Sequence, residues 1–284
     1  PTARAGRVEK GGIDMIVLVR GGGDLATGVA VRLYHSGLSV VISELAQPLT
    51  VRRMASFSEA VYTGEATVEG ISARRINDLE DTLRVLQVLS KGRIPVLVDP
   101  EARAATLLHP SVIVDGRMLK RPPEPLRHNA KLYLGLGPGF TAPDNCHAAI
   151  ETQRGPWLGR VIWQGSPRQD TGIPEAVAGQ ADSRVLRAPV DGIFVARVQI
   201  GEQLAAGQLV AEVGGQPVYA PFQGVLRGLL HSELPVKAGC KIGDLDPRND
   251  PTLCSLVSDK ALAVGGGVLE AILARPELRQ HLWS

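Results

Sequence analysis

The sequence predicts an α/β domain with a mostly parallel sheet, followed by a smaller all-β domain. Two observations lead to this prediction. Between residues 15 and 184, short apolar runs alternate with stretches of helical periodicity, which is the pattern of a sheet covered by helices on both faces. From residue 185 to residue 247 the helical period is lost, and short apolar segments are separated by glycine turns.

The elements of the first domain can be placed in order along the chain. Strands are expected at the apolar runs 16–19, 38–44, 94–99, 111–116 and 131–139. A helix is expected over 25–37, because its apolar residues have the spacing of one helical face and Gly37 is a typical helix stop. A second amphipathic helix is expected over 77–89, with Asn77 or Asp78 as its N-cap.

The all-β domain contains an internal repeat. Residues 186–213 align with residues 218–245 at an offset of 32 without a gap, so that Gly192 meets Gly224. One copy alone cannot bury its apolar face, and the pair therefore predicts a pseudo-symmetric β sandwich. The turn between the copies, 213–217, contains no lysine, so we expect no covalently attached biotin or lipoyl group.

The two ends of the chain differ in character from the domains between them. Residues 1–14 lack a pattern of buried structure, and we expect a flexible tail there. Residues 248–284 regain helical periodicity, and we expect this C-terminal segment to pack back on the α/β domain.

Composition and charge exclude several classes of function. With 31 basic and 29 acidic residues the net charge is only +2, which argues against a nucleic-acid partner. No apolar run approaches the ~20 residues of a membrane helix, and we expect no membrane association. The three cysteines lie far apart without a CxxC pair, so we predict no disulfide framework, no metal site and a cytoplasmic location.

A glycine cluster after the first strand predicts a phosphate-binding turn. Gly21-x-Gly23-x-x-Ala26 matches the dinucleotide fingerprint of Rossmann-like domains in its G/A form, and Glu44 follows 23 positions later at the end of the second strand. Backbone N–H groups at the helix start would hold the phosphates, and Glu44 would accept bonds from ribose hydroxyls. The candidate cofactor-binding residues here are Gly21, Gly22, Gly23, Ala26, Thr27, Gly28 and Glu44. The alternative is a tight turn without a ligand.

Asp24 complicates the glycine turn, because a carboxylate would repel a phosphate. It has two interpretations: a helix cap, or a catalytic residue that contacts a ribose or a metal.

A second glycine turn follows the strand at 131–139. Gly135, Gly137 and Gly139 are expected at the same carboxyl edge of the sheet as the first turn, as further cofactor-binding residues. His147, just beyond, is a candidate acid or base, with Glu151 four residues on along one helical face. A solvated pair on a surface helix is the alternative.

Cys254 is the third candidate catalytic residue, beside Asp24 and His147. A thiolate is suited to sulfur or selenium transfer, and Lys260 or a helix start nearby would lower its pKa. Its apolar neighbours Leu253 and Leu256 are equally compatible with a small core residue.

Taken together, nine segments between residues 20 and 273 resemble the YqeB family. They are RGGGDLATG, FSEAVYTGE, IPVLVDPE, GLGPGFTAPDNCHAAIETQRG, LGRVI, TGIPE, LRAPVDGIF, IGDLDPR and SDKALAVGGGVLEAIL. The resemblance implies a part in a selenium-dependent molybdenum hydroxylase system. It also implies a first domain similar to the Rossmann domain of XdhC-type accessory proteins, and a repeat domain that is a barrel-sandwich hybrid of the biotinyl/lipoyl type. One departure is the absence of a His near Pro156 or Trp157.

The function expected from this resemblance is that of an accessory or maturation protein. It would bind a nucleotide or a molybdopterin dinucleotide, carry selenium on Cys254, and meet a molybdenum hydroxylase or another maturation factor. Two alternatives stay open: an NAD(P)- or nucleotide-dependent enzyme, in which Glu44 would favour NAD, and a scaffold without catalysis. The oligomeric state also stays open, a homo-oligomer included.

Overall fold

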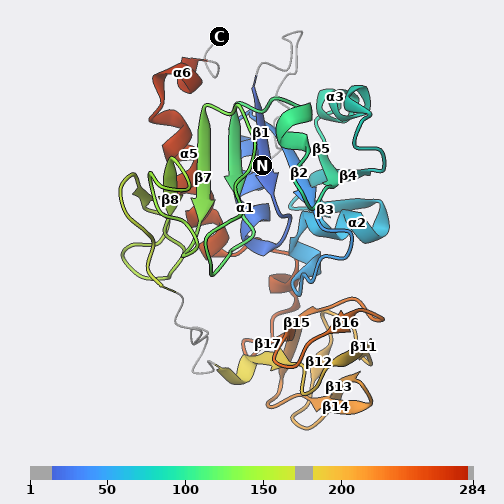
Figure 1. Cartoon of the computed structure of the whole chain (residues 1–284). Helices are drawn as coiled ribbons and strands as arrows, with labels where there is room; N and C mark the ends of the chain where they lie inside the picture. The colour runs from blue at the N-terminus through green and yellow to red at the C-terminus, as the bar shows by residue number, and fades with distance from the viewer. Residues whose placement is uncertain (1–14, 170–181, 281–284) are drawn as a thin grey trace, which may run out of the picture.

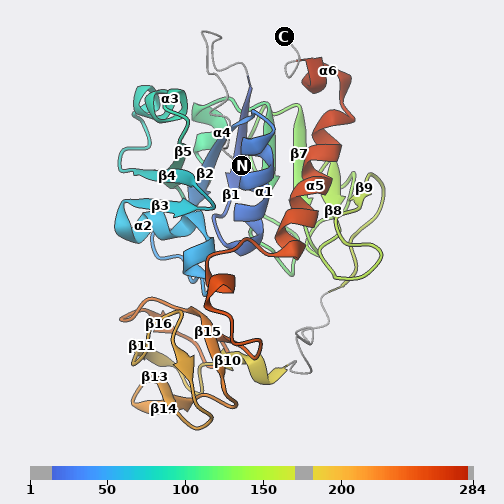
Figure 2. The same cartoon turned by 180° about the vertical axis from the view of Figure 1, so that it is seen from behind.

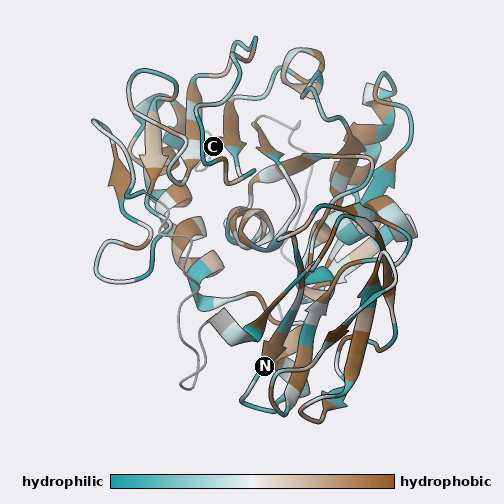
Figure 3. Ribbon diagram, turned by 60° about the horizontal axis from the view of Figure 1, so that its bottom comes forward, coloured by the Kyte–Doolittle hydropathy of each residue, from teal (hydrophilic) through white to brown (hydrophobic). Residues whose placement is uncertain are grey.

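The computed structural model describes residues 15–169 and 182–280, and the predicted tail at 1–14 lies outside these ranges. They form a larger part built on one wide sheet and a smaller all-β part beside it (Figure 1). Hydrophobic residues, brown in Figure 3, follow the strands of both parts. In the part of the chain that the structure describes, no helix has both the length and the apolar character that crossing a membrane requires.

The larger part contains a nine-stranded sheet with the order β3-β4-β5-β2-β1-β6-β7-β8-β9. Its strands are β1 (Ile16–Arg20), β2 (Ser39–Glu44), β3 (Glu65–Val68), β4 (Ile71–Ile76), β5 (Ile94–Val98), β6 (Val112–Asp115), β7 (Leu132–Leu136), β8 (Ala148–Ile150) and β9 (Val161–Ile162). From β4 to β8 neighbouring strands are parallel. Val17, Leu18 and Val19 of β1 are fully buried, because helices cover both faces of the sheet.

Helices and short 3-10 turns complete the larger part. The helices are α1 (Asp24–His35), α2 (Ala60–Thr63), α3 (Thr82–Ser90), α4 (Ala104–Leu107), α5 (Asp259–Leu273) and α6 (Pro276–Arg279), and the 3-10 turns are η1 (Arg53–Ala55) and η2 (Phe57–Glu59). Two further 3-10 turns, η3 (Asp182–Arg184) and η4 (Pro251–Cys254), lie against the smaller part. α5 lies alongside α1 on one face of the sheet (Figure 2). A Cβ on Gly28 would come within 2.5 Å of the Ala261 Cβ, so glycine permits this close approach.

The smaller part contains two four-stranded sheets, β10-β17-β15-β12 and β14-β13-β11-β16. Its strands are β10 (Val185–Arg187), β11 (Gly192–Ala196), β12 (Gln203–Leu204), β13 (Leu209–Val213), β14 (Gln216–Tyr219), β15 (Gly224–Leu229), β16 (Pro235–Val236) and β17 (Lys241–Asp246). The repeat offset of 32 residues relates β11 to β15, β12 to β16 and β13 to β17. Each sheet combines strands from both copies, so the two copies bury their apolar faces together.

The predicted fold class, a Rossmann-like parallel sheet with a barrel-sandwich hybrid, was wrong. The large sheet is mixed, because β3 and β9 pair antiparallel at its two edges. The hairpin from β3 to β4 is closed by Glu69 and Gly70, both with positive φ, which is the chemistry of a two-residue turn. The described residues show no barrel-sandwich domain, and β10 to β17 form two separate antiparallel sheets. The domain boundaries stay a prediction.

A short segment of the larger part is built into the smaller one. Val51 belongs to the apolar core of the all-β part, and its carbonyl accepts the N–H of Leu229 at 2.8 Å. Arg53 donates its Nε to the Leu229 carbonyl at 2.7 Å. A Cβ on Gly228 would come within 2.8 Å of Val51, so this strand too needs glycine at its contact point.

Candidate functional site

A cavity of about 560 Å³ lies at the carboxyl edge of the large sheet, where β5, β2, β1 and β6 end. Its lining residues are Arg20, Gly21, Gly23, Asp24, Leu25, Ala26, Ser43, Glu44, Leu45, Pro48, Leu49, Thr50, Asp99, Pro100, Gly116, Arg117, Met118 and Leu119. Ligands of open α/β sheets collect at this edge, because strand ends and helix starts meet there.

The glycine turn delivers the start of α1 to this cavity. Gly21 has a φ of +92°, which an L side chain rarely adopts, and its N–H is held by the Ser43 carbonyl at 2.7 Å. Gly23 is the N-cap residue and has no side chain to cover the helix end. The helical ladder begins with the Thr27 N–H on the Gly23 carbonyl, so the N–H groups of the preceding helical residues lie outside it. These groups and the helix dipole favour an anion in the cavity.

Glu44 closes the cavity on the side of β2 and is only 9% exposed. Its Oε2 accepts the N–H of Gly22 at 2.6 Å, and its Oε1 accepts the N–H of Leu45 at 2.7 Å. Burial raises the pKa of this carboxyl, while the two backbone hydrogen bonds lower it. Each carboxylate oxygen has a second lone pair, so Glu44 still has capacity to accept a bond from a hydroxyl in the cavity.

Two arginines meet a single buried carboxylate on the side of β6. Arg20 Nη1 lies 3.0 Å from Asp115 Oδ2, and Arg117 Nη2 lies 2.8 Å from the same oxygen. The hydroxyl of Tyr133 also donates to Asp115, at 3.1 Å, and burial raises the pKa of that phenol above its usual range. Arg117 Nη1 also lies 3.5 Å from Oε2 of Glu124, an exposed carboxylate that does not line the cavity, so Arg20 and Arg117 are the charged groups that this side presents to it.

The cavity is therefore polarised from one side to the other. On the acidic side, Glu44 ends β2 and Asp99 follows β5. On the basic side, Arg20 ends β1 and Arg117 follows β6, and these two strands are neighbours in the sheet. Asp99 uses both oxygens to accept the N–H groups of Arg103 and Ala104 at the start of α4. The start of α1 lies between the acidic and the basic side.

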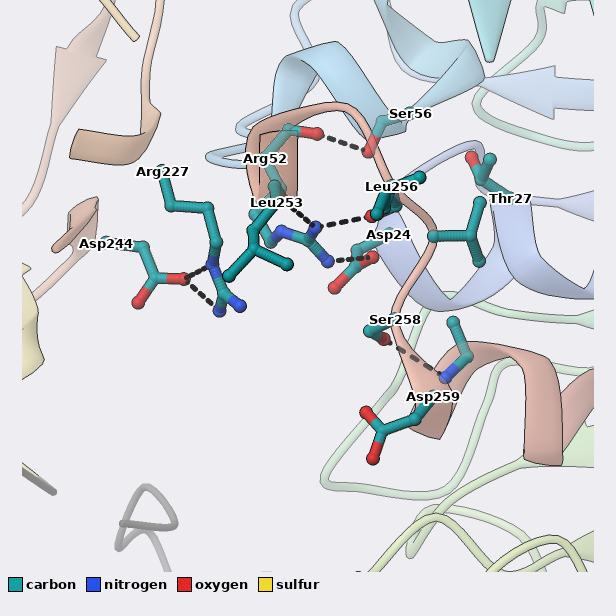
Figure 4. Close-up of polar contacts among 12 residues, drawn as sticks. Asp24, Thr27, Arg52, Ser56, Arg227, Asp244, Leu253, Leu256, Ser258 and Asp259 are labelled. Carbon is teal, nitrogen blue, oxygen red and sulfur yellow. Dashed lines mark hydrogen bonds and ion pairs between the residues drawn. The ribbon is translucent and has the colours of Figure 1, made fainter. Parts of the chain in front are cut away.

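Asp24 is paired with an arginine from outside the cavity (Figure 4). Its Oδ1 lies 2.8 Å from Arg52 Nη1, and Arg52 Nη2 donates to the carbonyls of Leu253 and Leu256 at 3.2 Å and 2.6 Å. Arg52 is only 6% exposed. The ion pair neutralises a carboxylate that would repel an anion. Through Arg52 it also holds the start of α1 against the segment between β17 and α5. Asp24 does not accept a helix-capping bond.

No protein-family model matches the chain. The chain is 42% identical over 258 residues to the protein YqeB of Escherichia coli (strain K12), which is described as uncharacterized. The chain is therefore similar to YqeB along most of its own length. The match covers 91% of this chain but 47% of YqeB, so the chain spans about half the length of that relative.

The solved structures that match the chain are distant from it. The ectoine utilization protein EutE (DoeB) from Ruegeria pomeroyi, in its product-bound structure, is 11% identical with a TM-score of 0.21, over 81% of this chain and 52% of that one. An aspartoacylase family protein from Mesorhizobium loti is 11% identical with a TM-score of 0.24, over 81% of this chain and 84% of that one. These TM-scores are too low to carry an argument about fold or activity.

Only some of the residues predicted in the first glycine turn line the cavity. Gly21, Gly23, Ala26 and Glu44 do, together with Asp24. The Gly22 N–H binds Glu44 instead, and the Thr27 hydroxyl donates to the Gly22 carbonyl and accepts the N–H of Phe57. Gly28 faces α5. These three residues therefore shape the turn rather than face a ligand.

The second glycine turn does not reach the cavity. Gly135 lies inside β7 against Phe140, and a Cβ on Gly139 would come within 2.5 Å of the Arg121 carbonyl. Gly137 has a φ of +84° and packs near Met118. Gly137 and Gly139 contact the 118–121 loop, whose residues Met118 and Leu119 line the cavity, so their contribution to the site is indirect.

His147 lies at the amino edge of the sheet, opposite the edge that holds the cavity. Residues 148–150 form β8, parallel to β7, rather than a helix, so His147 precedes the strand and Glu151 follows it. His147 Nδ1 accepts the N–H of Tyr133 at 2.8 Å, and burial, then Arg275, lower the pKa of its imidazole. Glu151 is buried and accepts the N–H groups of Gln153 and Arg168. The predicted His–Glu pair on one helical face was wrong, because the chain returns to the amino edge before β8 begins.

Cys254 is 1% exposed in η4, and its Sγ donates to the Leu226 carbonyl at 3.7 Å. Burial raises the pKa of this thiol. The environment therefore disfavours the thiolate that selenium handling requires. No group of three or more His, Cys, Asp or Glu side chains in the described ranges is arranged to hold a metal ion.

Arg20, Asp99, Asp115 and Arg117 are the charged site residues that the sequence analysis missed. Each lies at, or within two residues of, the end of a strand of the parallel sheet. The rule that ligands collect at the carboxyl edge could have identified them, since the runs IVLVR, IPVLVD and SVIVDGR each end in charged residues.

Proposed function

We propose that the chain is a nucleotide-binding protein and that the cavity at the carboxyl edge binds a nucleoside diphosphate group. The observation that carries this proposal is the polarised cavity, with the start of α1 between an acidic and a basic side. A nucleotide has the complementary polarity, because its phosphates are anionic and its ribose hydroxyls donate hydrogen bonds.

The phosphates would lie at the start of α1 and beside Arg117. The N–H groups of the first helical turn supply donors, and Arg117 is one-quarter exposed to the cavity. Arg52 neutralises Asp24, so the carboxylate nearest to the phosphates does not oppose them. An arginine is suited to this role, because its planar fork can bind a phosphate with two hydrogen bonds.

The ribose would lie against Glu44. A carboxylate at the end of the second strand of such a unit accepts bonds from the ribose hydroxyls and repels a 2′-phosphate. We therefore expect a nucleotide without a 2′-phosphate. The half-exposed side chains of Leu45 and Leu49 give the remaining wall an apolar surface that suits a nucleobase.

Isothermal titration of the full chain with ADP, NAD and NADP tests the proposal. We expect ADP and NAD to bind in the micromolar range and NADP at least about tenfold more weakly. Glu44→Gln is expected to weaken ADP binding about tenfold and to reduce the discrimination against NADP, because a neutral amide does not repel the 2′-phosphate. Glu277→Gln, at an exposed glutamate of α6, is the matched control. The proposal fails if no nucleotide binds, or if Glu44→Gln and Glu277→Gln behave alike.

We also propose that the wider role is that of an accessory or maturation protein for a selenium-dependent molybdenum hydroxylase. The nine sequence segments that resemble the YqeB family support this role, which the resemblance implies. The bound nucleotide would then be the dinucleotide end of the molybdenum cofactor, and the partner a hydroxylase or another maturation factor. Native mass spectrometry of the purified chain tests it: a molybdopterin dinucleotide mass supports the role, whereas bound NAD with redox turnover would favour a nucleotide-dependent enzyme.

A further inference from the structure

A second pocket, of about 200 Å³, lies at the amino edge of the large sheet, opposite the nucleotide cavity. Its lining residues are Arg74, Arg84, Gln87, Val88, Lys91 and Arg93. Arg74 lies in β4, Arg84 and Gln87 lie in α3, and Lys91 and Arg93 lie in the turn that leads into β5. α3 is far from the all-β part (Figure 1), so this pocket is independent of the contact between the two parts.

The pocket brings four cationic side chains together with one carboxylate. Glu65 Oε1 lies 3.1 Å from Arg74 Nη1 and 3.4 Å from Arg93 Nη1, and among the described residues it is the one acid within ion-pair distance of the four cations. Arg84 Nη1 donates to the neutral amide oxygen of Gln87 at 3.1 Å. Four positive charges against one negative charge leave an excess of three around a small space.

The end of α3 accounts for part of this cluster. Lys91 is the C-cap residue of α3, where the helix dipole favours a cation. The dipole does not explain why Arg74 approaches from the neighbouring strand, or why Arg84 projects from the first turn of α3 into the same space. Side chains of like charge repel one another when they converge, unless an anion lies between them.

We propose that this pocket binds a dianionic phosphoryl group, either inorganic phosphate or the phosphate of a monoester. Three guanidinium groups present planar pairs of N–H donors, which match phosphate oxygens, and Lys91 adds a flexible ammonium at the rim. The volume is below the ~300–1,000 Å³ of typical small-molecule sites, so the pocket holds the phosphoryl group and leaves the rest of an ester outside. The half-exposed side chains of Arg74 and Arg93, at 41% each, keep the pocket open to solvent.

Titration of the full chain with inorganic phosphate and with glycerol 3-phosphate tests the proposal and distinguishes the two sources. The double variant Arg84→Ala/Lys91→Ala leaves Glu65 and both of its partners intact. We expect it to weaken phosphate binding about tenfold or more, since each charge-assisted bond contributes about 1.5–3 kcal/mol. Arg84→Lys, which keeps the charge, is expected to retain most of the affinity.

Two controls separate this pocket from the nucleotide cavity and from general charge effects. Arg103→Ala removes an exposed arginine that pairs with Glu80 outside the pocket, and it should leave phosphate binding unchanged. Arg117→Ala should weaken nucleotide binding but not phosphate binding at α3. The proposal is overturned if the wild-type chain binds neither anion at millimolar concentration. It is equally overturned if a folded Arg84→Ala/Lys91→Ala variant, checked by its thermal midpoint, binds phosphate as tightly as the Arg103→Ala control.

Discussion

At the scale of single residues, Arg52 has two tasks that a mutation can separate. It neutralises Asp24 at the rim of the cavity, and it donates to the Leu253 and Leu256 carbonyls in the segment before α5. The first task concerns the ligand and the second concerns stability, because both carbonyls lose their donor if Arg52 is removed.

We expect Arg52→Ala to lower the free energy of unfolding by about 2–4 kcal/mol in urea titrations, since Arg52 is buried while Asp24 is partly exposed. The same variant should weaken ADP binding about tenfold, because the Asp24 carboxylate then faces the phosphates without its partner. Asp24→Asn is the matched variant: it should cost less stability and keep or strengthen ADP binding. If both variants weakened ADP binding equally, the neutralising role of Arg52 would be wrong.

For Glu44 and Cys254 the sequence left both a functional and a structural interpretation open, and access to the cavity distinguishes the two residues. Glu44 lies at a strand end and reaches the cavity, whereas Cys254 lies in a 3-10 turn under β15 with a thiol whose pKa is raised. Neither residue lies in one of the nine segments that resemble the YqeB family, so the resemblance could not rank them.

At the scale of elements, the contact between α1 and α5 depends on small residues. A Cβ on Gly265 would come within 2.8 Å of the Gly28 carbonyl oxygen and of Arg32, whereas a Cβ on Gly266 would meet nothing within 4 Å. The two adjacent glycines therefore form a matched pair on one helix.

We expect Gly265→Ala to destabilise the chain by about 1–3 kcal/mol, because the added methyl group forces α5 away from α1. Gly266→Ala should instead stabilise it by about 0.5–1 kcal/mol, since alanine favours a helix and no neighbour is displaced. Thermal and urea unfolding of both variants measures the difference. Equal effects at the two positions would show that α5 does not pack as the structure describes.

The elements that the sequence predicted well are those with local signals. The run from β1 through the glycine turn and α1 to β2 has a buried strand, a turn residue with positive φ and a periodic helix, all within 30 residues. The edge strands β3 and β9 were missed because they have only four and two residues, too few for a periodic apolar pattern. The three-residue strand β8 was assigned to a helix, since the spacing of His147 and Glu151 alone cannot distinguish a helix from a loop that crosses a strand.

At the scale of the whole molecule, one loop serves both the cavity and the contact between the two parts. Leu49 and Thr50 line the cavity, and the next residue, Val51, belongs to the core of the all-β part. The two carbonyl groups that Arg52 binds lie more than 200 residues away along the chain, which no periodicity or spacing could predict. The polarity of the cavity likewise arises only when β5, β2, β1 and β6 take their order in the sheet.

A crystal structure of the chain with ADP tests the nucleotide proposal most directly. We predict that the diphosphate oxygens accept hydrogen bonds from the backbone N–H groups of Asp24, Leu25 and Ala26 and from Arg117, and that the ribose hydroxyls donate to Glu44. ADP bound anywhere else on the chain, or bound in the cavity with its phosphates on the side of Glu44 and Asp99, would contradict the proposed function.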